Sequence, residues 1–157
     1  MIKGVTLIPL KTNIDERGFF REVLRVSDIE SFGQLSWSSM YSGVIKAFHL
    51  HQIQWDYWFC PIGTIKVVLV DLRNIKADNS MPYKKRYPSN LLTDEFLLGD
   101  NQPACVLRIP PGVAHGLKVL QGPAHLFYVT SHVYNPEDEG RIPHDALGYD
   151  WFKQEIK

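Results

Sequence analysis

Two histidines one residue apart, followed five positions later by a carboxylate, are the residues best suited to chemistry. His49, His51 and Asp56 lie in the stretch KAFHLHQIQWDYWFCPIG, and His115 follows a Pro-Pro-Gly turn in IPPGVAHG. On a strand, residues two apart share a face, so His49 and His51 are expected to point the same way. Neutral imidazoles with a carboxylate suit Zn, Fe, Ni or Mn, and an imidazole can also move protons near neutral pH. The pattern therefore predicts a metal site, a proton-transfer site, or a barrel mouth that merely collects polar side chains.

Short β-branched and aromatic runs, separated by Gly, Pro, Asn and Asp, must position these side chains. The runs cover residues 5–10, 18–26, 44–51, 55–60, 64–71, 104–109, 116–120 and 125–131. Only residues 27–32 and the tail from Asp145 have a helical pattern. Many short strands with closely spaced turns predict an all-β sandwich or barrel. No repeat or linker interrupts the pattern, so we expect residues 1–157 to form a single domain.

The composition excludes several classes of partner. Lys+Arg and Asp+Glu are balanced at 17 each, whereas nucleic-acid binders usually carry a basic excess. No apolar run reaches the roughly 18 residues of a membrane span, and the N-terminus lacks the apolar core of a signal peptide. Cys60 and Cys105 are the only cysteines and lie in separate apolar runs, which suits a reducing compartment. We therefore expect a cytoplasmic protein that binds neither nucleic acid nor membrane.

The spacing of the four candidate residues resembles the motifs of the cupins. The pattern is HxH, four residues, an acid, six residues and Gly63, then PxG, two residues and His115. In metal-binding cupins these side chains converge inside a small barrel, so the resemblance implies that His49, His51, Asp56 and His115 bind a divalent transition metal. The acid here is Asp, where Glu is usual.

The wider sequence is similar to the dTDP-4-dehydrorhamnose 3,5-epimerase family, whose members are cupin-like jelly rolls that work without a metal. The matching segments are DERGFFRE at 15–22, GVIKAFHLHQ at 43–52, VDLR at 70–73, IPPGVAHG at 109–116, YVTSHVYNPEDEG at 128–140 and DALGYDW at 145–151. They follow the family's order over nearly the whole chain. We therefore expect an all-β, cupin-like jelly-roll barrel with a short C-terminal helix.

The resemblance also assigns roles to residues. Epimerisation next to a ketone needs a base on one face of the sugar and an acid on the other. By resemblance His49 is the base and Tyr128 is the acid, while His115 and Tyr134 line the sugar pocket.

Further residues would hold the nucleotide. The resemblance implies that residues 5–22 reach across a homodimer interface, with Arg17 on the diphosphate and Phe20 and Glu22 near the thymine. Lys46 stands where the family has an Arg that contacts phosphate. Arginine suits a diphosphate because its planar fork donates two parallel hydrogen bonds.

Three departures from the family pattern affect the chemistry. His51 replaces a Gln, and Asp56 stands at or next to the position of a Lys that steadies the enolate. The family's L-S-x-x-D segment, whose Asp orients the catalytic His, has no counterpart before Lys157. Asp56 could replace that Asp and accept the proton of His49. Alternatively, a metal held by all four candidate residues could polarise the ketone, and His49 would then be a ligand and another residue the base.

We therefore expect an epimerase or isomerase of deoxysugar biosynthesis that abstracts a proton next to the ketone of a nucleotide-linked sugar, without a cofactor. One alternative is a metal-dependent cupin enzyme that acts on a small oxygenated substrate with a divalent transition metal. A second alternative is a relative that binds sugar nucleotides without catalysis.

Overall fold

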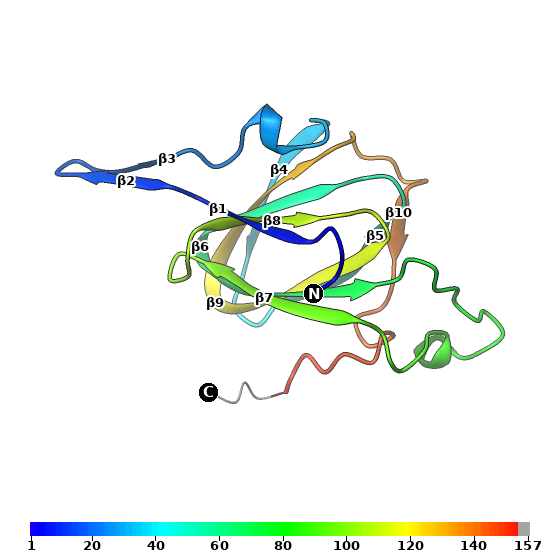
Figure 1. Ribbon diagram of the computed structural model, residues 1–157. Helices are drawn as coiled ribbons and strands as arrows, with labels where there is room; N and C mark the ends of the chain where they lie inside the picture. Colours follow the sequence, from blue (N-terminus) through cyan, green and yellow to red (C-terminus); the bar gives the residue numbers. More distant parts are fainter. Residues whose placement is uncertain (154–157) are drawn as a thin grey trace.

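The computed structural model describes residues 1–153, and β-strands form almost all of its regular structure (Figure 1). The strands are β1 (Thr6–Pro9), β2 (Thr12–Asp15), β3 (Gly18–Arg21), β4 (Gln34–Met40), β5 (Ile45–His51), β6 (Asp56–Asp71), β7 (Thr93–Gly99), β8 (Cys105–Ile109), β9 (Val113–Thr130) and β10 (Glu139–Arg141). The helical segments in this part of the chain are two 3₁₀ turns, η1 (Val26–Asp28) and η2 (Tyr83–Lys85). No helix among residues 1–153 is long and apolar enough to cross a membrane. The predicted all-β class is confirmed.

Two long antiparallel strands, β6 and β9, form the centre of the fold. They pair along most of their length, and each takes different outer partners in its two halves. The start of β6 pairs with β8 and the end of β9 pairs with β4, whereas the end of β6 pairs with β7 and the start of β9 pairs with β5. Because both halves of the sheet are built on β6 and β9, the sheet curves around one interior.

A register shift near Gly63 lets β6 serve both halves. Residues two apart on a strand share a face, so an irregularity is needed to change which set points inward. The pairing with β9 shifts between Phe59 and Ile65, and Gly63 adopts a positive φ of 75° there. The residues of the main core are even-numbered before the shift and odd-numbered after it: Trp58 and Cys60, then Ile65, Val67 and Leu69.

A Gly63→Ala variant is expected to lose about 2–5 kcal/mol of unfolding free energy, from the positive φ and from overpacking together. A Cβ at this position would lie 2.6 Å from the carbonyl oxygen of Gln121 and 2.7 Å from that of Pro123. Denaturant unfolding measures the loss. Gly148→Ala is the matched control, since Gly148 has a φ of 72° but nothing near its Cβ position. Equal losses in the two variants would show that close packing at Gly63 contributes nothing.

The C-terminal segment covers a second core on the outer face of the sheet. Ile142, Ala146, Leu147 and Trp151 pack there with Phe48 and its neighbours. The predicted C-terminal helix is wrong for the described residues, because residues 145–153 form turns. Gly148 disfavours a continuous helix, and the segment is held by side-chain packing and by a 2.9 Å hydrogen bond from Trp151 Nε1 to the His144 carbonyl. Residues 154–157 lie outside the described part.

The expected closed barrel is not found among residues 1–153. The main sheet runs in the order β1-β8-β6-β9-β5-β10, with β4 and β7 paired to the long strands off this path. Because β1 and β10 pair on one side only along this path, the sheet curls without closing. β4 and β5 pair with separate parts of β9, at its end and at its start.

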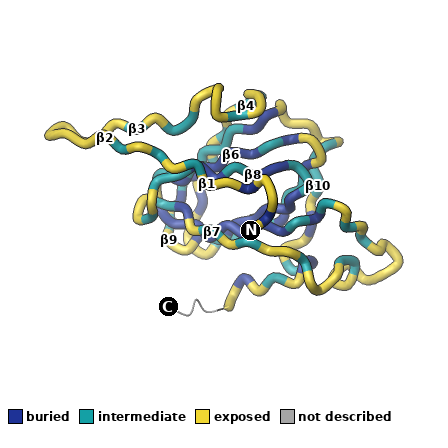
Figure 2. Tube along the Cα trace, in the orientation of Figure 1, coloured by how far each residue is buried: buried dark blue, intermediate teal, exposed yellow. Residues whose placement is uncertain are grey.

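The β2–β3 hairpin projects from the body of the molecule (Figure 1). It forms a separate two-stranded sheet, and Figure 2 shows it exposed along most of its length. Phe19 and Phe20 are more than 60% exposed at its tip side, at 66% and 63%. An isolated two-stranded hairpin is only marginally stable in water. Contact of the exposed aromatic residues with another surface would stabilise it.

Candidate functional site

A pocket of about 210 Å³ opens between the inner faces of β4, β5, β6 and β9. It contains seven of the residues singled out in the sequence, and both polar and apolar residues make up the rest of its lining. The former are Lys46, His49, His51, Asp56, His115, Tyr128 and Tyr134, and the latter include Gln34, Ser38, Gln54, Thr130 and Glu139. The pocket is smaller than the roughly 300–1,000 Å³ of sites that enclose a drug-sized ligand. It therefore suits a group the size of one sugar ring.

An irregularity in β5 brings Lys46 and His49 to the same pocket. Residues three apart on a regular strand point to opposite faces, but the pairing of β5 with β9 shifts register between these two residues. Lys46 Nζ then donates a 2.8 Å hydrogen bond to Ser38 Oγ on β4. A cation and a histidine therefore lie at the open side of the pocket.

His49 is oriented by Glu139, a residue that the sequence patterns did not single out. Its Nδ1 lies 3.1 Å from Oε1 of Glu139, because β10 pairs with β5. Burial alone would raise the pKa of Glu139, but the hydrogen bond and charge of Arg141, together with His49, lower it overall. The ionised carboxylate accepts the Nδ1 proton, which leaves Nε2 of His49 with a free lone pair. A histidine in this tautomer can act as a base.

Two tyrosines complete this part of the pocket. Tyr128 lies on β9 opposite Trp58 of β6 and lines the pocket. Tyr134 donates a 3.3 Å hydrogen bond from its hydroxyl to Oε2 of Glu139. Tyr134 therefore steadies the carboxylate that orients His49, while Tyr128 forms part of the pocket lining.

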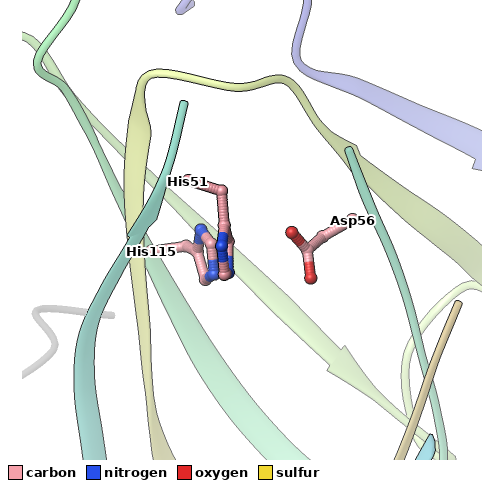
Figure 3. Close-up of side chains that lie close together, drawn as sticks. All are labelled: His51, Asp56 and His115. Atoms are coloured by element: carbon pink, nitrogen blue, oxygen red, sulfur yellow. The ribbon is translucent and has the colours of Figure 1, made fainter. Parts of the chain in front are cut away.

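His51, Asp56 and His115 form a deeper and more buried group (Figure 3). All three are buried, and their ligand atoms lie within 4.8 Å of one another. The imidazoles of His51 and His115 stack with ring centroids 5.5 Å apart. Figure 3 shows the Asp56 carboxylate facing both rings from the neighbouring strand. Three of the four predicted ligands thus come together, whereas His49 pairs with Glu139 and is not in the group.

Burial favours the neutral forms of this group. It lowers the pKa of His51 and lowers that of His115 to about 4. It also raises the pKa of Asp56, although the neighbouring His51 opposes the shift. Moving charge into a low-dielectric interior is costly unless an opposite charge is near.

Neighbouring residues fix the position of the group. Asp138 accepts hydrogen bonds from the backbone N–H groups of Gln52, Ile53 and Gln54, at 2.8, 3.2 and 3.3 Å, and so holds the loop between His51 and Asp56. Gln54 Nε2 donates a 3.2 Å hydrogen bond to Oδ2 of Asp56. The loop conformation is therefore specified by polar contacts on both sides.

The structure corrects one hypothesis and separates one set of residues from the pocket. In one of the two alternatives Asp56 accepts the proton of His49, but the hydrogen bond of His49 is to Glu139. Arg17, Phe20 and Glu22 do not line the pocket of their own chain. They lie on or beside the β2–β3 hairpin, where Arg17 pairs with Asp15. Glu139 lies in the matching segment at 128–140, directly after Glu137 and Asp138. This cluster of acidic residues is the sequence feature that could have indicated a carboxylate in the site.

The full-length motif pattern agrees with the comparison to known proteins. A family model described as dTDP-4-dehydrorhamnose 3,5-epimerase matches residues 1–157. The chain belongs to the dTDP-4-dehydrorhamnose 3,5-epimerase family. It is therefore homologous to sugar-nucleotide epimerases and isomerases, and the expected cupin-like fold is confirmed.

Three known proteins are similar to the chain over nearly its full length. The spore coat polysaccharide biosynthesis protein SpsL of Bacillus subtilis (strain 168) is 43% identical over 158 residues, which cover 96% of this chain and 97% of that protein. A crystal structure of dTDP-4-dehydrorhamnose 3,5-epimerase from Elizabethkingia anophelis NUHP1 is 27% identical, with a TM-score of 0.76 over 98% of this chain and 84% of that chain. A variant of the 3,4-ketoisomerase QdtA from Thermoanaerobacterium thermosaccharolyticum shares the fold at 18% identity, with a TM-score of 0.68 over 90% of this chain and 89% of that chain. Its crystal contains TDP-4-keto-6-deoxyglucose.

Proposed function

We propose that the protein epimerises or isomerises a nucleotide-linked 4-keto-6-deoxy sugar by proton transfer next to the ketone. The observation that carries the proposal is the pairing of His49 with Glu139 in the pocket that Tyr128 also lines. The family and the TDP-4-keto-6-deoxyglucose bound by the fold relative support this class of substrate. The spore coat polysaccharide role of SpsL supports a place in the synthesis of surface carbohydrate.

In this mechanism His49 Nε2 takes the proton from the carbon next to the ketone, and the electron pair of the broken C–H bond forms an enolate. Tyr128 then donates its hydroxyl proton to the opposite face of that carbon, which re-forms a C–H bond with inverted configuration. Exchange with water returns a proton to Tyr128 and removes one from His49. No redox change occurs, and each acid–base contribution is worth roughly 10²–10⁴ in rate.

The small pocket implies that the nucleotide lies outside it. We propose that the β2–β3 hairpin of a second copy supplies the nucleotide contacts, with Arg17 on the diphosphate and Phe20 and Glu22 near the thymine. The exposed Phe19 and Phe20 support this arrangement. An apolar groove of about 600 Å³, lined by Leu35, Phe59, Phe127 and other residues on the outer face of the sheet, supports the same homodimer.

Deuterium exchange tests the proposed function directly. Incubated in D₂O with dTDP-4-keto-6-deoxyglucose, the protein is expected to introduce deuterium at C3 or C5, which NMR or mass spectrometry detects. Tyr128→Phe removes the proposed acid. It is expected to slow the incorporation of deuterium on the face that Tyr128 protonates by about 10²-fold or more. Tyr83→Phe is the matched control, because the Tyr83 hydroxyl bonds to Asp145 far from the pocket. Tight nucleotide binding without exchange would instead support a binding protein that lacks catalysis.

A further inference from the structure

The proton-transfer mechanism leaves a buried hydrogen-bond acceptor of the pocket without a role. Asp56 is 4% exposed and lines the pocket, but the proposed proton transfers use only His49, Glu139 and Tyr128. Burying a carboxyl group costs free energy unless hydrogen bonds replace those it made to water. Gln54 Nε2 supplies one such bond, at 3.2 Å to Oδ2 of Asp56. A carboxylate has about four acceptor positions, so most of them remain for a partner in the pocket.

Trp58 places an unused hydrogen-bond donor beside this carboxyl group. It lies two residues after Asp56 on β6, and both side chains line the pocket. Burial raises the pKa of the carboxyl, while His51, Gln54 and Trp58 oppose the rise. Trp58 has this effect because its N–H lies near the carboxyl, yet Nε1 is buried and forms no hydrogen bond within residues 1–153. An indole N–H can only donate, and a buried donor without an acceptor is costly to maintain.

We propose that Asp56 and Trp58 together bind one ring hydroxyl of the substrate, with the Asp56 carboxyl as the acceptor and Trp58 Nε1 as the donor. A hydroxyl has one hydrogen to donate and lone pairs that accept, so it satisfies both partners at once. A ketone oxygen has no hydrogen to donate to the carboxyl. The assignment rests on the proposed function, because it takes the ligand to be a nucleotide-linked sugar.

The separations in this part of the pocket leave room for one oxygen atom. Side-chain oxygen and nitrogen atoms of Asp56, His51 and His115 lie within 4.8 Å of one another, yet neither imidazole forms a hydrogen bond with the carboxyl in the described part of the chain. Two hydrogen bonds of about 2.8 Å that meet at one oxygen at a near-tetrahedral angle join atoms about 4.6 Å apart. A hydroxyl oxygen therefore fits between the carboxyl and the imidazoles that Figure 3 shows facing it.

Trp58 is a suitable donor because other donors of the pocket already have acceptors. Gln54 Nε2 donates to the carboxyl itself, and Lys46 Nζ donates to a serine hydroxyl on β4. His115 Nδ1 donates to a backbone carbonyl at 3.1 Å. Burial lowers the pKa of His115 to about 4, so near neutral pH its Nε2 carries a lone pair and accepts rather than donates.

The proposed substrate class has a suitable hydroxyl at C2 and another at C3. A 4-keto-6-deoxyhexose that is linked to the nucleotide through C1 has no other free hydroxyl on its ring. A site built around a hydroxyl discriminates strongly against the analogue that lacks it, because the buried polar groups are then left unpaired. Asp56 and Trp58 are therefore specificity-determining residues, which select sugars that retain this hydroxyl.

Calorimetric titration with unreactive sugars tests the contact without reference to catalysis. The ligands are dTDP-glucose and its 2-deoxy and 3-deoxy analogues, which carry no ketone. One of the two analogues is expected to bind the wild-type protein about 10-fold or more weakly than dTDP-glucose. Asp56→Ala should bring this ratio of affinities close to one, and Trp58→Phe should lower it several-fold, since each removes a group that contacts the hydroxyl. Asp56→Asn keeps an accepting oxygen and should show an intermediate ratio.

The ratio distinguishes the proposed contact from a general loss of structure. A variant that only loosens the pocket weakens the binding of both ligands alike and leaves their ratio unchanged. Trp37→Phe is the matched control for Trp58→Phe, because Trp37 is 62% exposed and does not line the pocket. It should keep the wild-type ratio. Circular dichroism establishes that each variant is folded.

Two results would overturn the proposal. One is that dTDP-glucose binds the wild-type protein no more tightly than both deoxy analogues. The other is that Asp56→Ala and Trp58→Phe keep the wild-type ratio. Either result leaves the proposed epimerase function standing if deuterium exchange is observed. If no dTDP-sugar binds and no exchange occurs, the proposed function fails and this assignment fails with it.

Discussion

A Glu139→Gln variant is expected to exchange substrate deuterium about 10²–10⁴-fold more slowly while it keeps its affinity for the nucleotide. The carboxylate accepts the Nδ1 proton of His49 and is itself held by Tyr134 and Arg141. A glutamine of the same length can turn its NH₂ group toward Nδ1 and so stabilise the tautomer whose Nε2 carries the proton. His49 would remain in place but would be unable to accept a proton from the substrate.

Two measurements and a control variant distinguish this positioning role from a general loss of structure. The rate loss should appear in kcat and not in KM for the nucleotide sugar. The imidazole ¹⁵N shifts of His49 should report a change of tautomer in Glu139→Gln. Glu137→Gln, a change at an exposed neighbour in the same segment, should alter neither quantity. Unchanged kcat in Glu139→Gln would show that His49 does not depend on this carboxylate.

Mixing two inactive variants is expected to restore activity to about a quarter of the wild-type value. When equal amounts of the two chains form twofold dimers at random, about half of the dimers contain one chain of each kind. Each of these mixed dimers has one intact site of its two. The two variants are Arg17→Ala, which removes the proposed diphosphate contact, and His49→Gln, which removes the base. In a mixed dimer, one site combines His49 of the Arg17→Ala chain with Arg17 of the His49→Gln chain. The expected rescue rests on the proposed homodimer, and it is consistent with the position of Arg17 in the β2–β3 hairpin, outside the pocket of its own chain.

The experiment requires subunit exchange, which mass spectrometry of differently tagged chains can verify. Each variant measured alone gives the baseline. Mixing His49→Gln with Glu139→Gln is the control, because both residues lie in the same pocket and a mixed dimer then has no intact site. If the first mixture stays at the baseline although mixed dimers are present, the hairpin does not complete the partner's site.

The sequence was informative wherever local pattern decided the structure. Strand periodicity and turn residues predicted the all-β class, and the spacing around His51, Asp56 and His115 predicted a convergence that the structure shows. The partner of His49 depends on a different kind of information. Glu139 reaches it through the pairing of β10 with β5 across 90 positions of sequence, and no local pattern encodes that register.

The C-terminal segment shows the same limit. Its apolar residues were spaced as in a helix, but their packing partners are on the outer face of the sheet. Tertiary contacts to Phe48 and Val68 replaced the helical hydrogen bonds that local propensity suggested. Propensity is a weak guide when a short segment can bury an aromatic residue such as Trp151 against an existing surface.

The long pairing of β6 with β9 also determines when the site can form during folding. Asp56 pairs with Thr130 and Leu69 pairs with His115, so this ladder joins residues that are far apart in the sequence. Folds dominated by such non-local pairings form in milliseconds to seconds, more slowly than helical bundles, because the intervening chain must be ordered before the contacts stabilise it. Asp56, His115 and Tyr128 all lie on this ladder. We therefore expect the candidate site to form only once the long-range pairing of β6 with β9 is in place.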